Sequence, residues 1–267
     1  MSRGVPTAMT IAGSDSGGGA GIQADLKTFA ALGVYGTSVL TAITAQNTLR
    51  VTAVHEVPTD VVAAQIDAVV SDIGADAVKT GMLSSAAIIE TVAAALERHD
   101  LRTLVVDPVM VAKSGDRLLR ADAVDALRRR LLPLATVVTP NIPEAEVLTR
   151  RQIRSLEDAH RAARDIVGMG ARAAVVKGGH LEGPPIDVFC DGEVLREIRG
   201  ERIVTKNTHG TGCTFASAIA AHLAKGYEVE EAVARAKEFV TEALRHAYPI
   251  GQGHGPLHHF WRLWSGG

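Results

Sequence analysis

Short runs of Val, Ile and Ala alternate with longer Ala- and Leu-rich segments along the whole chain, and this alternation constrains the fold more than any other feature. Many of the short runs carry few polar residues, which indicates strands that are buried on both faces. The longer segments place their apolar residues at the spacing of an α-helix. This alternation predicts an α/β fold, a doubly wound and mostly parallel sheet flanked by helices.

The same pattern gives the bounds of each expected element. The strand candidates are Ala8–Ala12, Ser38–Ile43, Val51–Val57, Ala77–Thr80, Leu104–Asp107, Val137–Thr139, Ala174–Lys177, Ile186–Cys190 and Val194–Ile198. The helix candidates are Ile22–Leu32, Thr59–Ile73, Ser84–Arg98, Ala121–Leu131, Ser155–Met169, Thr211–Lys225 and Val229–His246. Asp191-Gly192, between the last two strands, is a hairpin signal and predicts an antiparallel edge. No repeat or shift in composition divides the chain, so we expect a single domain over residues 1–267.

Composition and charge exclude several classes of protein. The formal net charge of −2 gives no basic field that would favour nucleic acid or an anionic membrane as a partner. Every apolar run is shorter than the roughly 20 residues that span a bilayer, and the N-terminus lacks the apolar region of a signal peptide. Two cysteines do not make a disulfide framework. We therefore expect a cytoplasmic protein with reduced thiols.

A glycine-rich stretch at residues 207–215, Asn-Thr-His-Gly-Thr-Gly-Cys-Thr-Phe, follows a short β-like run at 202–205 and opens a helix. Gly210 and Gly212 allow a sharp turn, and the helix start directs N–H groups and a partial positive charge into that turn. Such a turn suits a phosphate or a phosphoryl group in transfer. Cys213 lies in the same field, which predicts a lowered thiol pKa. A glycine-rich helix start with a buried cysteine is the alternative.

In sheets of this kind the ligand lies outside the carboxyl ends of the strands, so the residues after each strand are the informative ones. A glycine-rich loop, residues 13–21, follows the first strand and fits neither the dinucleotide-binding fingerprint nor a Walker A loop. We interpret it as open backbone for a flat ligand, with a flexible turn as the alternative. Gln46 offers a donor and an acceptor for the edge of a heteroaromatic ring. Met82 belongs either to a pocket wall or to the core.

Acidic and basic side chains follow three later strands. Asp107 ends one strand, and Asn141 and Glu144 come after the next. Their oxygen atoms suit Mg²⁺, which keeps several waters and bridges phosphates. Lys177 ends a further strand, where its charge is able to neutralise phosphate oxygens. Acids, a lysine, two glycine loops and a thiol on one rim of one sheet together predict phosphoryl transfer by positioning and charge stabilisation.

The chain resembles the ribokinase-like kinases and, more narrowly, the bacterial hydroxymethylpyrimidine/phosphomethylpyrimidine kinases of thiamine biosynthesis. The motifs that carry the resemblance run nearly end to end and lie at residues 13–28, 45–48, 81–83, 107–110, 112–115, 139–141, 177–180, 207–214 and 253–260. The resemblance implies ATP-dependent phosphorylation of 4-amino-5-hydroxymethyl-2-methylpyrimidine, and then of its monophosphate, by a homodimer that uses Mg²⁺. Cys213 stands where sugar kinases of this fold carry an aspartate base, which argues against a sugar kinase.

The resemblance also implies a role for each matching residue. The substrate ring is assigned to Gln46, Gly13, Ala20, Met82 and Val109, and the ATP phosphates to Asn141, Lys177 and Thr208. Mg²⁺ is assigned to Asp107 and Glu144, the anion hole to Gly210, Thr211 and Gly212, and the proton transfer to Cys213. Residues 112–118, polar and glycine-bearing, are expected to form a lid that excludes water.

Several alternatives stay open. His209 is either a phosphate contact or a polar turn residue, and Cys190 is expected to be a small buried hydrophobe. His254, His258 and His259 suggest a metal site, but docking of a closing tail by Phe260, Trp261 and Trp264 is the preferred interpretation. A pyridoxine or pyridoxal kinase is the alternative enzyme, because that ring is also flat and carries a hydroxymethyl group. A pyrimidine-binding module without transfer is the non-enzymatic alternative.

Overall fold

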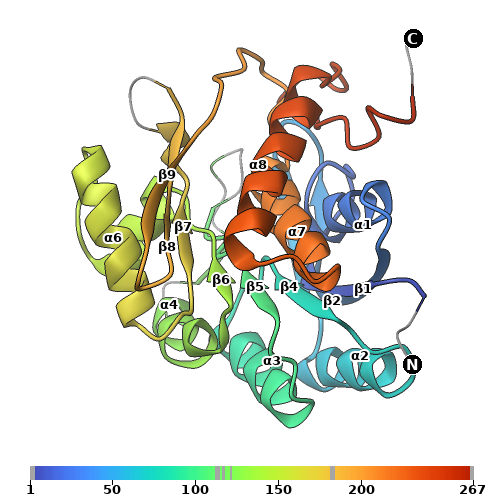
Figure 1. Cartoon of the computed structure of the whole chain (residues 1–267). Coiled ribbons are helices and arrows are strands. Elements are labelled where there is room, and N and C mark those ends of the chain that lie inside the picture. Colours follow the sequence, from blue (N-terminus) through green and yellow to red (C-terminus); the bar gives the residue numbers. More distant parts are fainter. Residues whose placement is uncertain (1–3, 112–114, 116–117, 121, 181–183, 265–267) are drawn as a thin grey trace.

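The computed structural model of the protein describes residues 4–111, 115, 118–120, 122–180 and 184–264. Within these residues, nine strands form one sheet in the order β3-β2-β1-β4-β5-β6-β7-β8-β9 (Figure 1). The strands are β1 (Thr7–Asp15), β2 (Tyr35–Gln46), β3 (Val51–Glu56), β4 (Ala77–Thr80), β5 (Leu104–Val106), β6 (Val137–Val138), β7 (Ala174–Val176), β8 (Ile186–Cys190) and β9 (Leu195–Arg199). Each matches a predicted strand.

The centre of the sheet is parallel, as the unbroken apolar runs predict. Neighbouring strands from β2 through β1 and β4 to β7 all pair in parallel. The hairpin β8–β9 gives the expected antiparallel edge. A second antiparallel edge, β2–β3, was not predicted. Strand order reverses at β1, and doubly wound folds bind ligands beside such a reversal, here at the carboxyl ends of β1 and β4.

Helices cover both faces of the sheet (Figure 1). One face packs against α1 (Gly21–Ala31), α7 (Thr211–Ala224) and α8 (Val229–Arg245). The other face packs against α2 (Thr59–Asp72), α3 (Ala86–Arg98), α4 (Ala123–Ala126) with its π-helical continuation Leu127–Leu131, α5 (Ile142–Thr149) and α6 (Leu156–Gly168). Short 3₁₀ turns at Leu132–Leu134 and Gly178–His180 complete the elements. None of the described helices combines the length and the apolar character needed to cross a membrane.

Two local predictions need correction. Helix α5 was not predicted, because it has only eight residues and Pro143 lies in its first turn. Proline is well tolerated there, since the first helical N–H groups have no partner within the helix. The β-like run at 202–205 is not a strand, and its Val204 side chain is 96% exposed. Apolar residues alone do not make a strand where no neighbouring strand supplies hydrogen bonds.

Candidate active site

The two glycine loops predicted from the sequence meet in the structure. Gly210 adopts a φ of 85°, and a Cβ atom placed on it would come within 1.8 Å of the carbonyl oxygen of Gly19. A Cβ atom on Gly19 would in turn come within 2.4 Å of the His209 ring. The start of α7 therefore lies directly on the loop that follows β1.

Asp15 fixes the first glycine loop from inside. Its carboxylate accepts hydrogen bonds from the backbone N–H groups of Gly17 at 2.8 Å, Gly19 at 3.0 Å and Ala20 at 2.8 Å. Nε2 of His209 lies 2.8 Å from the same carboxylate. Burial opposes ionisation of Asp15, but His209 and the amides hold its pKa below the ordinary value. The loop is thus a fixed scaffold and not a flexible turn, with these three amides already bonded to Asp15.

At the start of α7, Gly212 faces the ends of two strands. A Cβ atom on Gly212 would lie 3.3 Å from Nζ of Lys177 and 3.7 Å from Oδ2 of Asp107. The hydroxyl of Thr211 donates to the carbonyl oxygen of Thr208 at 2.7 Å, which stabilises the turn. The structure therefore brings together the predicted anion hole, the residue after β5 and the residue after β7.

Asp107, Lys177 and Glu144 form a buried charged cluster. Nζ of Lys177 donates to Oδ1 of Asp107 at 3.2 Å, and the hydroxyl of Thr139 donates to the same oxygen at 3.3 Å. Burial raises the pKa of Glu144 to about 7, with Lys177 lowering it and Asp107 raising it further. A cation bound beside the carboxylates of Glu144 and Asp107 would stabilise their ionised forms and so lower the free-energy cost of burying two negative charges together.

Asn141 and Glu144 also cap helix α5. The side chain of Asn141 accepts from the Glu144 backbone N–H at 2.9 Å, and the Asn141 backbone N–H donates to Glu144 Oε2 at 2.8 Å. The described residues contain no group of three or more His, Cys, Asp or Glu side chains able to hold a metal ion. Two carboxylates nevertheless fit Mg²⁺, which takes one or two protein carboxylates and completes its shell with water and phosphate oxygens.

The thiol of Cys213 lies beside the loop and the charged cluster, but one prediction about it is wrong. The sulfur accepts a hydrogen bond from the Gly21 backbone N–H, and Lys79 and Asp107 act on it electrostatically. Burial raises the pKa of the Cys213 thiol to about 11, even though Lys79 opposes the shift. Lost hydration and the nearby carboxylates outweigh the helix start, so the predicted lowering of this pKa is not observed.

The residues predicted to hold the substrate ring lie near the carboxyl ends of β1, β2 and β4. Sδ of Met82 would lie 3.0 Å from a Cβ atom on Gly13, so the two residues are in contact. Gln46, half-buried at the end of β2, places Nε2 at 3.5 Å from Nε2 of His209. Ala20 is held on the opposite loop by Asp15.

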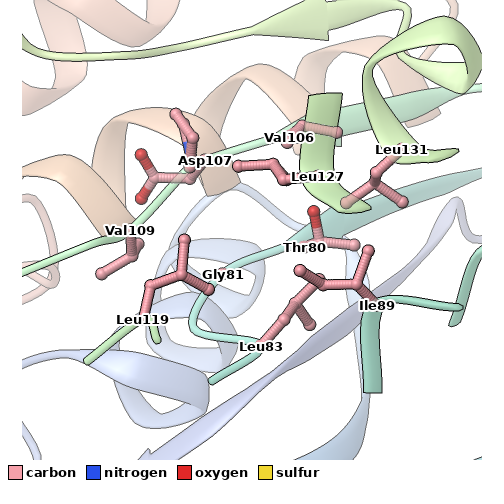
Figure 2. A pocket seen from close by; sticks show the side chains of 11 residues that line it. Thr80, Gly81, Leu83, Ile89, Val106, Asp107, Val109, Leu119, Leu127 and Leu131 are labelled. Carbon is pink, nitrogen blue, oxygen red and sulfur yellow. The ribbon is translucent and has the colours of Figure 1, made fainter. Parts of the chain in front are cut away.

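Val109, which follows β5, completes this set. Figure 2 shows Val109 and Asp107 around a small hollow that is also lined by Thr80, Gly81 and Leu119. Its volume of about 10 Å³ admits no more than a water molecule. A substrate ring would therefore lie outside this hollow and not within it.

The C-terminal tail closes over the second glycine loop. The backbone N–H of His209 donates to the carbonyl oxygen of Gly255 at 3.0 Å, and Nε2 of His259 lies 2.9 Å from the Thr214 hydroxyl. Trp261 stacks on His246, and Trp264 packs against His258 and Phe260. The tail is docked as predicted, and Cys190 is buried in the apolar core as expected. The predicted lid at 112–118 falls mainly outside the described residues.

Sequence reasoning missed two features of the site. The role of His209 was left open and its contact with Asp15 was not predicted, and neither was the buried pair of Lys79 and Asp25. Nζ of Lys79 lies 2.9 Å from both carboxylate oxygens of Asp25, with both side chains fully buried. A lysine inside the otherwise apolar strand Ala77–Thr80 was the available signal.

Comparison with known proteins agrees with this geometry. The sequence model of the family described as phosphomethylpyrimidine kinase matches residues 15–258. The chain is 57% identical to the hydroxymethylpyrimidine/phosphomethylpyrimidine kinase of Rhizobium meliloti, covering 97% of this chain and 98% of that protein. It is also 57% identical to the thiamine biosynthesis bifunctional protein ThiED of Geobacter sulfurreducens, over 94% of this chain but about half of that longer protein, 51%.

Solved structures give the same result for the fold. A Bacillus subtilis pyridoxal kinase in complex with ADP superposes with a TM-score of 0.90 at 44% identity, covering 97% of this chain and 99% of that chain. A phosphomethylpyrimidine kinase from Clostridium difficile superposes with a TM-score of 0.81 at 46% identity, covering 90% and 99%. The predicted ribokinase-like architecture is confirmed.

Proposed function

Because the chain belongs to the phosphomethylpyrimidine kinase family, we propose that it transfers the γ-phosphoryl group of ATP to 4-amino-5-hydroxymethyl-2-methylpyrimidine and then to the resulting monophosphate. The enzyme is a phosphotransferase of thiamine biosynthesis. One observation carries the proposal: Gly212, at the start of α7, lies against both Lys177 and Asp107. A helix start, a cation and a carboxylate at one point are what a phosphoryl group in transfer requires.

The carboxyl ends of β1 and β4 are the proposed place of the pyrimidine ring. We assign the ring edge to the amide of Gln46, which is half-buried at the end of β2 and whose backbone is hydrogen-bonded to Ser16 in the first glycine loop. Met82 and Val109 supply apolar contact to the faces of the ring. His209 and Asp15 hold this loop against the start of α7, so they fix the distance between the ring and the anion hole.

In the first transfer, the hydroxymethyl oxygen bonds to the γ-phosphorus while the bond from that phosphorus to the β,γ-bridging oxygen breaks and ADP leaves. The hydroxyl proton passes to the sulfur of Cys213 in its thiolate form, which becomes the thiol; because burial raises the pKa of this thiol to about 11, only the thiolate fraction of the enzyme can carry out this step. Backbone N–H groups of Gly210, Thr211 and Gly212 stabilise the charge on the moving group. In the second transfer the acceptor is a phosphate oxygen, so no alcohol proton has to be removed.

We assign the ATP phosphates to Lys177, Asn141 and Thr208. Lys177 is partly exposed and points its ammonium at the same space as Gly212. Asp107 and Glu144 would hold Mg²⁺, which supplies charge neutralisation for the phosphates when bound. The raised pKa of Glu144, caused by burial and by Asp107, supports this assignment, because a cation favours the ionised carboxylate.

We further propose a cytoplasmic homodimer. Both cysteines are free thiols, which suits a reducing compartment. The β2–β3 edge exposes Ile43, Leu49 and Val54, each about half accessible, at 52%, 56% and 45%. Exposed apolar side chains at an open edge of a sheet favour contact with a second copy. Sedimentation equilibrium of the wild type and of an Ile43→Glu variant tests this arrangement.

The function is tested by incubating the protein with ATP, Mg²⁺ and hydroxymethylpyrimidine and following product mass over time. Monophosphate and then diphosphate are expected in succession. Likeness to the pyridoxal kinase of Bacillus subtilis makes pyridoxal the competing substrate. A higher kcat/KM on pyridoxal than on hydroxymethylpyrimidine would reverse the assignment, and the absence of ADP release with either would end it.

A further inference from the structure

A second layer of polar side chains lies directly beneath Cys213, in a part of the structure that the proposed reaction does not use. Asp25 lies on α1 one turn after Gly21, and Ser217 lies on α7 one turn after Cys213. Side chains four residues apart share a helix face. The two packed helices therefore form two levels: Gly21 with Cys213 above, and Asp25 with Ser217 below.

The lower level is fully bonded. The hydroxyls of Ser217 and Thr10 each donate to Asp25 at 2.6 Å, one to each carboxylate oxygen. Nζ of Lys79 donates to both oxygens at 2.9 Å. Lys79 is paired with Thr10 in the β1–β4 register, so both side chains rise from the sheet on the face that α1 and α7 cover. Asp25 of α1 is thus bonded to two residues of the sheet, Thr10 and Lys79, and to Ser217 of α7.

The ammonium of Lys79 reaches the edge of the active site. A Cβ atom placed on Gly81, at the carboxyl end of β4, would lie only 2.9 Å from Nζ of Lys79. The charged groups that act on Cys213 are Lys79 from β4, Asp25 from α1, Asp107 after β5 and Lys177 after β7. They form two oppositely charged pairs, and Glu144 adds a further carboxyl group beside Asp107 and Lys177, so these pairs leave no spare cation to balance a thiolate. Lys79 is the cation with the largest effect on the sulfur.

Stability alone does not account for this pair. Replacing a buried ion pair by apolar residues is often neutral or stabilising, because both ions lose hydration. Here the two ions lie under a thiol that must accept a proton. We propose that Lys79, oriented by Asp25, is a positioning residue for phosphoryl transfer, and that its buried ammonium stabilises negative charge on the Cys213 sulfur. This role rests on the proposed kinase reaction, but its test does not need substrate.

The test is the rate at which iodoacetamide alkylates Cys213, measured from pH 7 to pH 9.5 by peptide mass spectrometry. Only the thiolate reacts, so the rate follows the thiolate fraction. Cys190 is buried in the core and serves as the internal report of folding, because it is alkylated only in unfolded chains. Lys79→Met is expected to react about tenfold or more slowly than wild type at each pH, since a nearby opposite charge shifts a pKa by roughly 1–3 units.

Asp25→Asn is expected to act in the opposite direction and to speed alkylation, because it removes the negative charge and leaves Lys79. Opposite effects of two partners in one ion pair distinguish electrostatic support from a loss of structure. Lys237→Met is the matched control, because Lys237 forms a 2.6 Å pair with Asp187 on other elements. In Lys237→Met, Cys213 should be alkylated at the wild-type rate.

The proposal is overturned if Cys213 in Lys79→Met is alkylated at the wild-type rate while Cys190 stays protected. It is also overturned if Lys79→Met and Asp25→Asn both slow the alkylation of Cys213 to the same extent. If a single variant exposes Cys190, the double variant Lys79→Met/Asp25→Asn removes both charges, and it should still react more slowly than wild type. An alkylation rate of Cys213 equal to that of the wild type in the double variant would also overturn the proposal.

In the kinase assay Lys79→Met should lower kcat and leave KM near the wild-type value. A wild type that makes no product would reject the kinase and leave the alkylation result intact.

Discussion

The carbonyl oxygen of Gly19 lies against Gly210 so closely that any side chain at Gly210 would overlap it, at 1.8 Å for a Cβ atom. Gly19 belongs to the loop that would carry the pyrimidine, and Gly210 begins the helix that would carry the phosphoryl group. The contact therefore sets the distance between acceptor and donor. A small displacement of one loop from the other would misplace the acceptor relative to the phosphoryl group, and in-line transfer tolerates little misplacement.

Gly210→Ala is expected to lower turnover by about a hundredfold or more, since a displacement of about 1 Å costs that much in a positioned reaction. Gly226→Ala is the matched control. Gly226 has nearly the same backbone angle, with a φ of 83° against 85°, and in the described part of the chain no atom lies within 4 Å of its added Cβ. Both variants carry the backbone strain, but only Gly210→Ala separates the loops. Equal turnover in the two variants would show that the contact does not control the reaction.

Lys177→Met should raise KM for ATP and reduce kcat/KM by about 10² to 10³, because a preorganised charge on the phosphates is lost. The same change removes the cation that Asp107 and Glu144 share, so their mutual repulsion should weaken folding as well. Initial rates over a range of ATP concentrations check this. Lys225→Met, at an exposed position after α7, changes the net charge equally and should leave kcat/KM unaltered.

The sequence predicted the sheet well because buried parallel strands leave a local signature, an apolar run followed by a polar residue. Asp107 and Lys177 were found by that signature, and the sheet then brought them together. His209 and Asp15 were not paired in advance, because 194 residues separate them and only the docking of α7 on the first loop joins them. Helix α5 was too short for its periodicity to be recognised.

The direction of the Cys213 pKa shift could not be predicted from the sequence either. A helix start lowers a thiol pKa and burial raises it, and the number of atoms around the sulfur depends on how α1, α7 and β4 pack. The structure shows that burial is the larger effect. Lys79 was similarly ambiguous, since a lysine in a strand points to solvent unless a carboxylate such as Asp25 lies opposite.

Cys213→Ala is expected to lower the first phosphorylation by at least about a hundredfold, the usual contribution of a general base. The second phosphorylation should lose less, because its acceptor carries no alcohol proton. Separate assays on hydroxymethylpyrimidine and on its monophosphate check the difference. Equal losses in both steps would mean that the sulfur shapes the pocket and does not accept the proton.

The pH dependence of the first step gives a further check on the sulfur. With a pKa of about 11, the thiolate fraction of Cys213 rises about tenfold per pH unit from neutral pH upward. Wild-type kcat should therefore increase with pH between 7 and 9.5, and the residual rate of Cys213→Ala should stay flat. Parallel profiles in the two proteins would contradict proton transfer to this thiol.

His259 should make the fold sensitive to acid. It is a buried residue of the tail, its Nε2 lies 2.9 Å from the Thr214 hydroxyl of α7, and burial lowers its pKa to about 4. The unfolded chain binds a proton at this residue below about pH 6.5, whereas the folded chain does so only near pH 4. The unfolded state therefore holds more protons between these values, so stability falls as the pH falls through that window.

The loss attributable to His259 is at most roughly 3 kcal/mol, from the difference between the two pKa values. His259→Gln should flatten the decline of Tm between pH 6.5 and 4, while His222, whose pKa burial also lowers to about 4, preserves part of it. His55→Gln, on the exposed strand β3, is the control and should keep the full wild-type slope. Thermal unfolding at half-unit pH intervals measures all three proteins. If Tm declines alike in His259→Gln and His55→Gln, protonation of the buried His259 imidazole is not the cause of the acid sensitivity.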